Sequence, residues 1–231
     1  MTITYHPEVD QGSEEWHAMR LGIITASQMS LVLTPTLKVA NNDKTRQFVW
    51  ELAAQRISRY VEPSYIGDNM LRGWEDEIRA RDLYSERYEP VTQVGFVTND
   101  EWGFTLGYSP DGLIGEDGLW EAKSRIQKYQ IQTIVENEMP VDYVLQVQSG
   151  MLVTKRKWTD FTSYSGGLPM VTMRVYPDPV IQNAIVEACG DFDAKVCKAV
   201  ASFNDIIAAG GRYIPTERIV EQEMYIGGEA A

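Results

Sequence analysis

Three charged residues in one short stretch of the chain, Asp111, Glu121 and Lys123, have the types and the spacing of a hydrolytic site. Residues 115–118 (GEDG) lie between them and form a strong turn signal, flanked by apolar residues that favour strands. We therefore expect a β-hairpin in which Asp111 begins one strand and Glu121 lies nearby on its partner. Glu121 and Lys123 are two residues apart on that strand, so they share a face. Two carboxylates and a lysine then converge on one point.

This combination of side chains is suited to metal-dependent hydrolysis of a phosphodiester. Carboxylate oxygens suit Mg²⁺, which keeps waters and also takes substrate phosphate oxygens, and a lysine beside it can hold a water or stabilise the developing charge. The competing interpretation is a Pro-Asp-Gly turn followed by a solvated strand. However, Leu119, Trp120 and Ala122 make the strand apolar around its charges, and a buried charged pair needs a reason. The apolar context therefore favours a site.

Five blocks along the chain extend this interpretation beyond the hairpin. They are residues 15–27 (EWHAMRLGIITAS), 72–77 (RGWEDE), 109–112 (SPDG), 121–123 (EAK) and 146–148 (QVQ). In this order they resemble the lambda-exonuclease (YqaJ-type viral recombinase) branch of the PD-(D/E)xK nuclease superfamily. The first block is the most specific, because a restriction enzyme with the same core has no reason to carry it. The resemblance implies an α/β fold with a PD-(D/E)xK (restriction-endonuclease-like) core, and it fades after about Ser163.

The resemblance implies a role for each residue of the hairpin. Asp111 would bridge two Mg²⁺ ions, for which Mn²⁺ is a possible substitute. Glu121, with the carbonyl of Ala122, would hold the ion on the nucleophile side. Lys123 would orient the attacking water and stabilise charge in the transition state.

Two further residues are implied to support this centre. Glu77 corresponds to an extra acidic residue near the metals, although residues 75–77 also look like a solvated acidic run. Gln146 is implied to position Lys123 or a substrate phosphate, whereas Gln148 is expected to face solvent or to make a helix contact. The family often has a tyrosine where this chain has Ser149, so an aromatic or hydroxyl support is not expected from that position.

The first block is implied to bind the terminal 5′-phosphate of DNA. Arg20, Ser27 and Thr25 would supply a guanidinium fork, hydroxyls and a helix N-terminus, which together form an anion cradle. A second basic residue is expected shortly downstream, and either Lys38 or Arg46 could serve. The alternatives are that Arg20 pairs with a glutamate at residues 14–15 and that Ser27 only caps a helix.

Periodicity and breakers predict the surrounding elements. We expect a mixed central sheet of about five strands flanked by helices on both faces, in a single domain spanning residues 1–231. Trp16 is expected in the core, whereas Trp102 and Tyr108 fit either a core or a base-stacking role. Helices are expected at about 13–22, 25–33, 44–60, 70–88, 126–135, 142–153 and 179–201, and strands at 91–97, 104–108, the hairpin, 157–164 and 170–176.

The charge balance argues against a protein that coats DNA. Twenty-one Lys and Arg against 33 Asp and Glu give a net charge of −12, whereas such proteins are usually basic. Contact with DNA must therefore be local, along basic clusters at Lys38 with residues 44–46, at residues 123–128 and at residues 155–157. The acidic tail, residues 217–229, is expected on the solvated outer surface.

Other composition features narrow the class of protein. The two histidines disfavour a zinc centre, and Cys189 and Cys197 are expected to be buried thiols in a helix. No apolar run approaches the ~20 residues that span a bilayer, and the N-terminal residues do not read as a signal peptide. We expect a cytoplasmic protein, encoded by a phage or prophage in a bacterial host, with no membrane partner.

The resemblance implies a Mg²⁺-dependent 5′→3′ exonuclease that acts on double-stranded DNA ends and leaves 3′ single-stranded tails for recombination. It also implies a ring-shaped homotrimer and a single-strand annealing protein as partner. One alternative is a site-specific endonuclease with the same core, which an assay on linear and circular DNA separates. Another is a non-enzymatic acidic DNA mimic, which would spread its carboxylates over the surface and digest no DNA.

Overall fold

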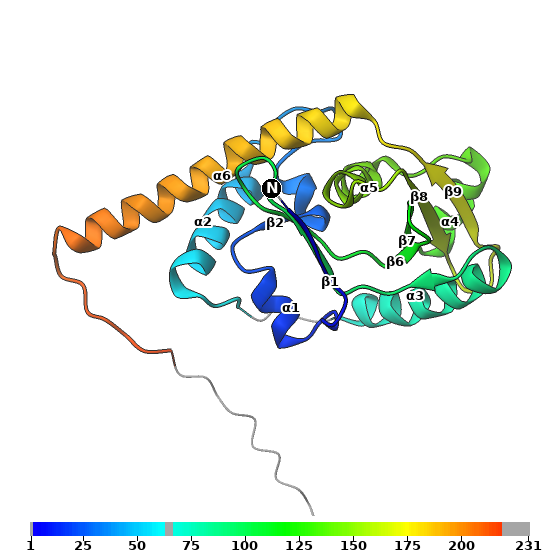
Figure 1. Cartoon of the computed structure of the whole chain (residues 1–231), viewed down its shortest axis with the longest axis horizontal. Coiled ribbons are helices and arrows are strands. Elements are labelled where there is room, and N and C mark those ends of the chain that lie inside the picture. The colour runs from blue at the N-terminus through cyan, green and yellow to red at the C-terminus, as the bar shows by residue number, and fades with distance from the viewer. Residues whose placement is uncertain (1, 63–66, 219–231) are drawn as a thin grey trace, which may run out of the picture.

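Two β-sheets and the helices packed on them make up the part of the chain described by the computed structural model, residues 2–62 and 67–218 (Figure 1). Most of the predicted acidic tail lies outside these residues. Within them, no helix is both long and apolar enough to cross a membrane.

The larger sheet confirms the predicted mixed sheet of five strands. Its β7 and β8 are parallel, and every other neighbouring pair is antiparallel. In spatial order its strands are β3 (Val91–Thr92), β6 (Gly112–Ile114), β7 (Gly118–Ser124), β8 (Trp158–Tyr164) and β9 (Val171–Val175).

A smaller sheet contains two strands that the sequence did not predict, β1 and β2. Its strands are, in spatial order, β1 (Ile3–His6), β4 (Phe96–Asn99), β5 (Leu106–Tyr108) and β2 (Ile24–Thr25). β2 runs parallel to β5, so the first sequence block lies beside the strand that leads into Asp111.

The single strand predicted at residues 91–97 is wrong, because β3 and β4 belong to different sheets. The chain changes sheet near Gly95, where a Cβ would lie 1.7 Å from the carbonyl oxygen of Val9. Only glycine allows this close backbone approach.

The helices begin and end close to the predicted positions, and several have side-chain caps. Ser13, Asn42 and Asp178 accept backbone N–H bonds at the starts of three of them. The helices are α1 (Glu14–Met19), the 3₁₀ helix η1 (Ala26–Leu31), α2 (Asp43–Ser58), α3 (Asp68–Arg87), α4 (Gln127–Glu136), α5 (Val141–Thr154) and α6 (Pro179–Ala208).

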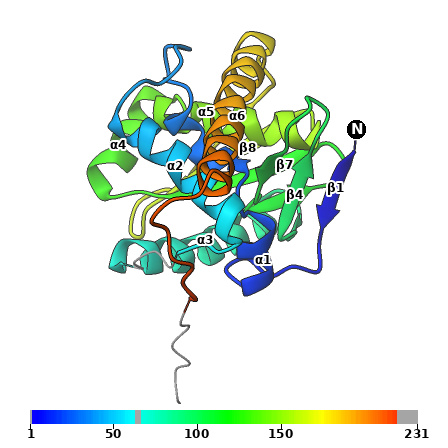
Figure 2. The ribbon, with the colours of Figure 1, turned by 90° about the vertical axis from the view of Figure 1, so that its left-hand side faces the viewer.

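Helix α6 runs seven residues beyond the predicted end at residue 201, because the next breaker is the glycine pair at 210–211. Helix α6 packs beside α2 (Figure 2), and its last turns are exposed and extend past the body of the molecule (Figure 1).

Strand β7 separates two apolar clusters, so helices cover both faces of its sheet as predicted. Leu119 belongs to the larger cluster, with residues of α5 and α6. Trp120 and Ala122 point the other way and pack against Ala80 and Tyr84 of α3. Glu121 and Lys123, which alternate with Trp120 and Ala122, therefore belong to the face that α5 covers.

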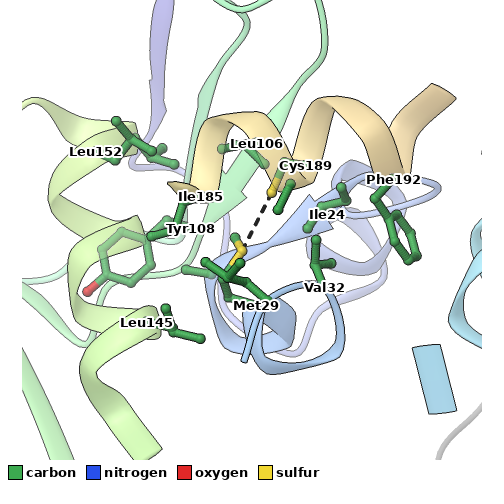
Figure 3. Packing of buried hydrophobic residues seen from close by; sticks show 14 of the residues in the cluster. Ile24, Met29, Val32, Leu106, Tyr108, Leu145, Leu152, Ile185, Cys189 and Phe192 are labelled. Atoms are coloured by element: carbon green, nitrogen blue, oxygen red, sulfur yellow. Dashed lines mark hydrogen bonds between the residues drawn. The ribbon is translucent and has the colours of Figure 1, made fainter. Parts of the chain in front are cut away.

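The larger cluster also shows where one of the cysteine predictions fails. Cys189 is buried against Met29 (Figure 3), and burial raises the pKa of its thiol to about 12. Cys197 is exposed, because it lies on α6 at a position that turns away from this cluster.

Candidate active site

The β6–β7 hairpin places Asp111 directly opposite Glu121. Gly112 pairs with Trp120, so the residue before Gly112 faces the residue after Trp120. The Asp111 carboxylate accepts a hydrogen bond of 2.8 Å from the backbone N–H of Ala122. The hairpin pairing thus brings the backbone positions of the two carboxylates together.

Glu121 is fully buried and accepts three hydrogen bonds from side chains. Lys123 Nζ lies 2.6 Å from Oε1, and the amide of Gln146 on α5 donates to the same oxygen. Tyr108 at the end of β5 donates to Oε2 over 2.7 Å. A buried carboxylate persists only when it is bonded in this way, so these three side chains hold its charge and orientation.

The electrostatics of the centre favour a cation. Burial raises the pKa of Asp111 well above its usual range, the charges of Glu121 and Glu77 raise it further, and Lys123 opposes them. Burial by itself would lower the pKa of Lys123, but the charges of Glu121 and Asp111 raise it above its ordinary value. Lys123 is therefore an ammonium at neutral pH, and its positive charge faces the carboxyl groups of Asp111 and Glu121.

Glu77 lies at the edge of this centre, on α3. Burial raises its pKa, and the neighbouring Arg81, 3.6 Å away, acts in the opposite direction. Within the described residues, no hydrogen bond joins Glu77 to Asp111 or Glu121. The preceding Asp76 is buried and accepts a bond of 2.6 Å from Ser124, so residues 75–77 are not a uniformly solvated run.

The two carboxylates of the centre could hold a divalent cation. Within residues 2–62 and 67–218, no group of three or more His, Cys, Asp and Glu side chains is arranged to hold a metal ion. Mg²⁺ is usually held by one or two carboxylates, waters and substrate phosphate, and Asp111 and Glu121 supply two carboxylates. A bound dication would offset both the burial and the carboxylate repulsion that raise the pKa of Asp111.

A second cluster surrounds Arg20, which follows α1. Its guanidinium stacks 4.0 Å from the centre of the Trp16 ring and donates to Ser109 (3.1 Å) and Thr25 (3.4 Å). Trp16 also donates to Ser109, over 2.8 Å. Burial lowers the pKa of Arg20 to about 10, which still leaves it charged at neutral pH. The cluster is a held guanidinium beside two hydroxyl groups.

The contacts of this cluster bear on the alternatives left open for Arg20 and Ser27, and they show that the core position expected for Trp16 is wrong. Arg20 makes no ion pair with the glutamates at 14–15 in the described part of the chain, and its partners are hydroxyls. Trp16 is only half-buried, because it stacks on Arg20 instead of entering the core. Ser27 is exposed, and its hydroxyl lies 3.3 Å from that of Thr25. The Thr25 hydroxyl donates to Gln28 and makes no cap bond at the start of η1.

Other sequence-predicted residues do not join these clusters. Lys38 is exposed in a turn whose backbone bonds to Thr34, and no hydrogen bond or ion pair within the described ranges links it to Arg20. Gln148 is buried, contrary to the solvent-facing alternative. It bonds the backbone of Tyr176 and Asp178 and so holds the start of α6.

The basic cluster at residues 155–157 is largely engaged by the protein itself. Arg156 donates to the carbonyls of Gly115 (2.9 Å) and Gly118 (2.7 Å) and thereby holds the hairpin turn. Lys155 pairs with Glu101 and Lys157 with Asp117. In the basic cluster at residues 123–128, Arg125 is engaged, among the described residues, by aromatic side chains and not by carboxylates. It donates to the hydroxyl of Tyr143 and stacks on the rings of Tyr129 and Tyr143.

Sequence reasoning missed the contacts of Tyr108 and Ser109. They occupy adjacent positions in the same GYSPDG segment as Asp111, and each bonds one of the two clusters. Their proximity to Asp111 in the sequence was the available signal, since the partners of Ser109, Trp16 and Arg20, are distant along the chain.

Comparisons with known proteins agree with this geometry. The sequence matches YqaJ-like viral recombinase domains over residues 15–157. No curated protein matches it. Among solved structures, the chain is similar to an alkaline exonuclease (LHK-Exo) from Laribacter hongkongensis, with 31% identity, a TM-score of 0.76 and coverage of 85% of this chain and 99% of that chain.

Two further structures extend the comparison. LHK-Exo in complex with dAMP gives the same identity and coverage and a TM-score of 0.77. A phage-related exonuclease from Haemophilus somnus 129PT has 12% identity, a TM-score of 0.56 and coverage of 78% of this chain and 96% of that chain, and it supports the fold alone. Because the family match spans more than half of the sequence and includes both clusters, the chain belongs to the family of YqaJ-like viral recombinase domains.

Proposed function

We propose that this protein is a Mg²⁺-dependent 5′→3′ exonuclease that degrades one strand of linear double-stranded DNA and leaves 3′ single-stranded tails for phage-type recombination. The observation that supports it most is the link between the two clusters. The buried centre at Glu121 suits phosphodiester hydrolysis, and the Arg20 cluster, which shares Ser109 with the segment of Asp111, suits a terminal phosphate. The similarity to alkaline exonucleases supports the reaction class.

Asp111, Glu121 and the carbonyl of Ala122 would hold the metal, as two Mg²⁺ ions with Mn²⁺ as a possible substitute. When bound, the metal would supply Lewis-acid stabilisation of the phosphate. Glu77 would act on the centre from its edge, through water, and Gln146 would keep Glu121 oriented.

Lys123 acts as a cation in this mechanism. Its raised pKa means that it holds its proton at neutral pH, so it is not a general base. The ammonium of Lys123 is held 2.6 Å from Glu121 Oε1. From this position the ammonium donates to the attacking water and stabilises negative charge as it develops on the phosphate.

Arg20 and the hydroxyls of Thr25 and Ser27 would bind the terminal 5′-phosphate. The Trp16 ring and Ser109 hold the guanidinium in place before DNA arrives. Within the described residues Lys38 makes no hydrogen bond or ion pair to Arg20, so we assign it a general contact with the DNA backbone.

We further propose a ring-shaped homotrimer and a single-strand annealing protein as partner. A ring would keep most of the −12 charge on the outside while basic side chains face the DNA. The projecting end of α6 supports an assembly, because Phe203, Ile206 and Ile207 are 44%, 54% and 44% exposed.

The test is digestion of linear duplex DNA with 5′-phosphate or 5′-hydroxyl ends, and of closed circular duplex, each with Mg²⁺ or EDTA. We expect loss of linear DNA in Mg²⁺ only, faster from phosphorylated ends. Cleavage of the circle would indicate an endonuclease instead. No digestion in any arm, together with inhibition of basic DNA-binding proteins, would indicate the acidic mimic, although the full burial of Glu121 beside a mostly covered Lys123 argues against it.

A further inference from the structure

The hydroxyl of Tyr108 is placed where it controls one of the metal-binding carboxylates. Its ring is buried in the larger apolar cluster, and its hydroxyl points out of that cluster (Figure 3). The hydroxyl donates to Glu121 Oε2 over 2.7 Å, whereas Lys123 and Gln146 both bond Oε1. Tyr108 is thus the residue that holds the second oxygen of this carboxylate.

The surrounding backbone leaves room for this ring and little more. A Cβ at Gly150 would lie 2.8 Å from Cζ of Tyr108 and 2.9 Å from Cε1, closer than atoms pack. The neighbouring Ser149 does not reach the site, because its hydroxyl donates to the carbonyl of Leu145, one turn back in α5. A tyrosine from β5, packed on a glycine of α5, therefore supplies the hydroxyl in this chain.

We propose that Tyr108 is a positioning residue that orients Glu121 for metal binding, an inference that rests on the proposed metal-dependent function. A carboxylate has about four acceptor positions, and three donors occupy three of them. The fourth acceptor position lies on Oε2, beside the bond from Tyr108. Because that bond restricts rotation of the carboxylate about Cγ–Cδ, it fixes the direction of the fourth position. Tyr108 itself is buried and does not meet DNA.

Burial raises the pKa of Tyr108 well above its ordinary value, and the charges of Glu121 and Asp111 raise it further. The hydroxyl therefore remains a donor across the neutral and alkaline range. No change of its protonation is needed for the role proposed above.

The chain offers a matched control in Tyr84. It is also a fully buried tyrosine, and its hydroxyl donates to a buried carboxylate, that of Asp160, over 2.6 Å. It packs on the α3 side of β7, against Trp120, on the opposite face from Glu121. Tyr84→Phe removes the same type of bond away from the site.

The experiment compares Tyr108→Phe, Tyr84→Phe and the wild type by calorimetric binding of Mn²⁺, by digestion of linear duplex at varied Mg²⁺, and by thermal melting. A hydrogen bond to a charged group contributes about 1.5–3 kcal/mol, which is roughly tenfold or more in an equilibrium constant. We expect Tyr108→Phe to weaken Mn²⁺ binding and to raise the half-activating Mg²⁺ concentration by about that factor. The KM for DNA should be unchanged, and Tyr84→Phe should melt at a similarly lowered temperature with wild-type metal response.

Equal Mn²⁺ affinity in Tyr108→Phe and the wild type would overturn the proposal, as would an equal loss of affinity in Tyr84→Phe, which would show a purely structural effect. These outcomes are distinct from failure of the proposed function. In that case the wild type itself would bind Mn²⁺ without digesting DNA, and the ratio of Mn²⁺ affinities would still test Tyr108.

Discussion

Arg20 donates a hydrogen bond of 3.1 Å to Ser109, which lies two residues before Asp111. The cradle and the hydrolytic centre therefore share one short segment of backbone. Parallel pairing of β2 with β5, Thr25 beside Gly107, fixes the same two regions a second time. A phosphate held by Arg20 would lie at a set distance from the centre, which suits an enzyme that measures from a DNA end.

Replacement of Arg20 should separate end recognition from general DNA affinity. Arg20→Ala should bind duplex at similar salt but lose its preference for 5′-phosphorylated over 5′-hydroxyl ends by roughly tenfold or more, since a charge-assisted contact contributes about 1.5–3 kcal/mol. Initial rates on the two substrates measure this. Lys38→Ala is the comparison, because no hydrogen bond or ion pair in the described part of the chain joins Lys38 to Arg20. It should keep the end preference and at most flatten the salt dependence of binding by about one unit of slope. If Arg20→Ala keeps the wild-type ratio of initial rates on 5′-phosphorylated and 5′-hydroxyl ends, Arg20 does not bind the terminal phosphate.

Lys123 should be needed for turnover and dispensable for metal binding. Lys123→Met keeps the length of the side chain and removes its charge, so Asp111 and Glu121 lose the ammonium that opposes their mutual repulsion. We expect Mn²⁺ affinity equal to or above that of the wild type and no detectable digestion. Asp111→Ala should lose both properties while remaining folded. Near-full activity in Lys123→Met would show that the ammonium does not act on the phosphate.

Asp111→Asn should stabilise the metal-free protein as the pH rises. The folded-state pKa of Asp111 is raised by burial and by the neighbouring carboxylates, above the value of about 3.9 for an unfolded chain. Its contribution to stability is therefore present below that value and is lost as pH rises through the raised folded pKa. Asparagine keeps the shape without the ionisation.

The measurement is thermal melting in EDTA and in Mg²⁺ at pH 5 and pH 8. In EDTA, the melting temperature of Asp111→Asn should exceed that of the wild type by more at pH 8 than at pH 5. Each kcal/mol of added stability should raise the melting temperature by roughly 2–4 °C. In Mg²⁺ at pH 8, the wild type should gain stability and the variant should not. A wild type that melts at or above the variant in EDTA at pH 8 would contradict the assigned electrostatics.

The proposed ring predicts a definite mass. Size-exclusion chromatography with light scattering should give three times the chain mass of 26.2 kDa at micromolar concentration. The exposed apolar residues at the end of α6 give a physical reason for association. A clean monomer would leave a nuclease that works through a simple cleft.

The sequence by itself determined the features that depend on neighbours along the chain. The hairpin follows from a Gly-Glu-Asp-Gly turn between apolar arms, and pairing within about a dozen residues brings Asp111 to Glu121. The starts of α2 and α6 follow from Asn42 and Asp178, whose side chains bond N–H groups only two or three residues away. Roles for Arg20, Glu77 and Gln146 came from resemblance, since no local pattern separates them from surface residues.

Only the tertiary structure decided which distant side chains complete the clusters. Arg20 meets Ser109 across 89 positions and Gln146 meets Glu121 across 25. Tyr108 reaches Glu121 because β5 and α5 pack together over Gly150, and Gly95 divides a predicted strand because Val9 packs on it. Propensity and periodicity describe a residue's own segment, whereas these contacts depend on how separate segments pack, which is set by the burial of the whole core.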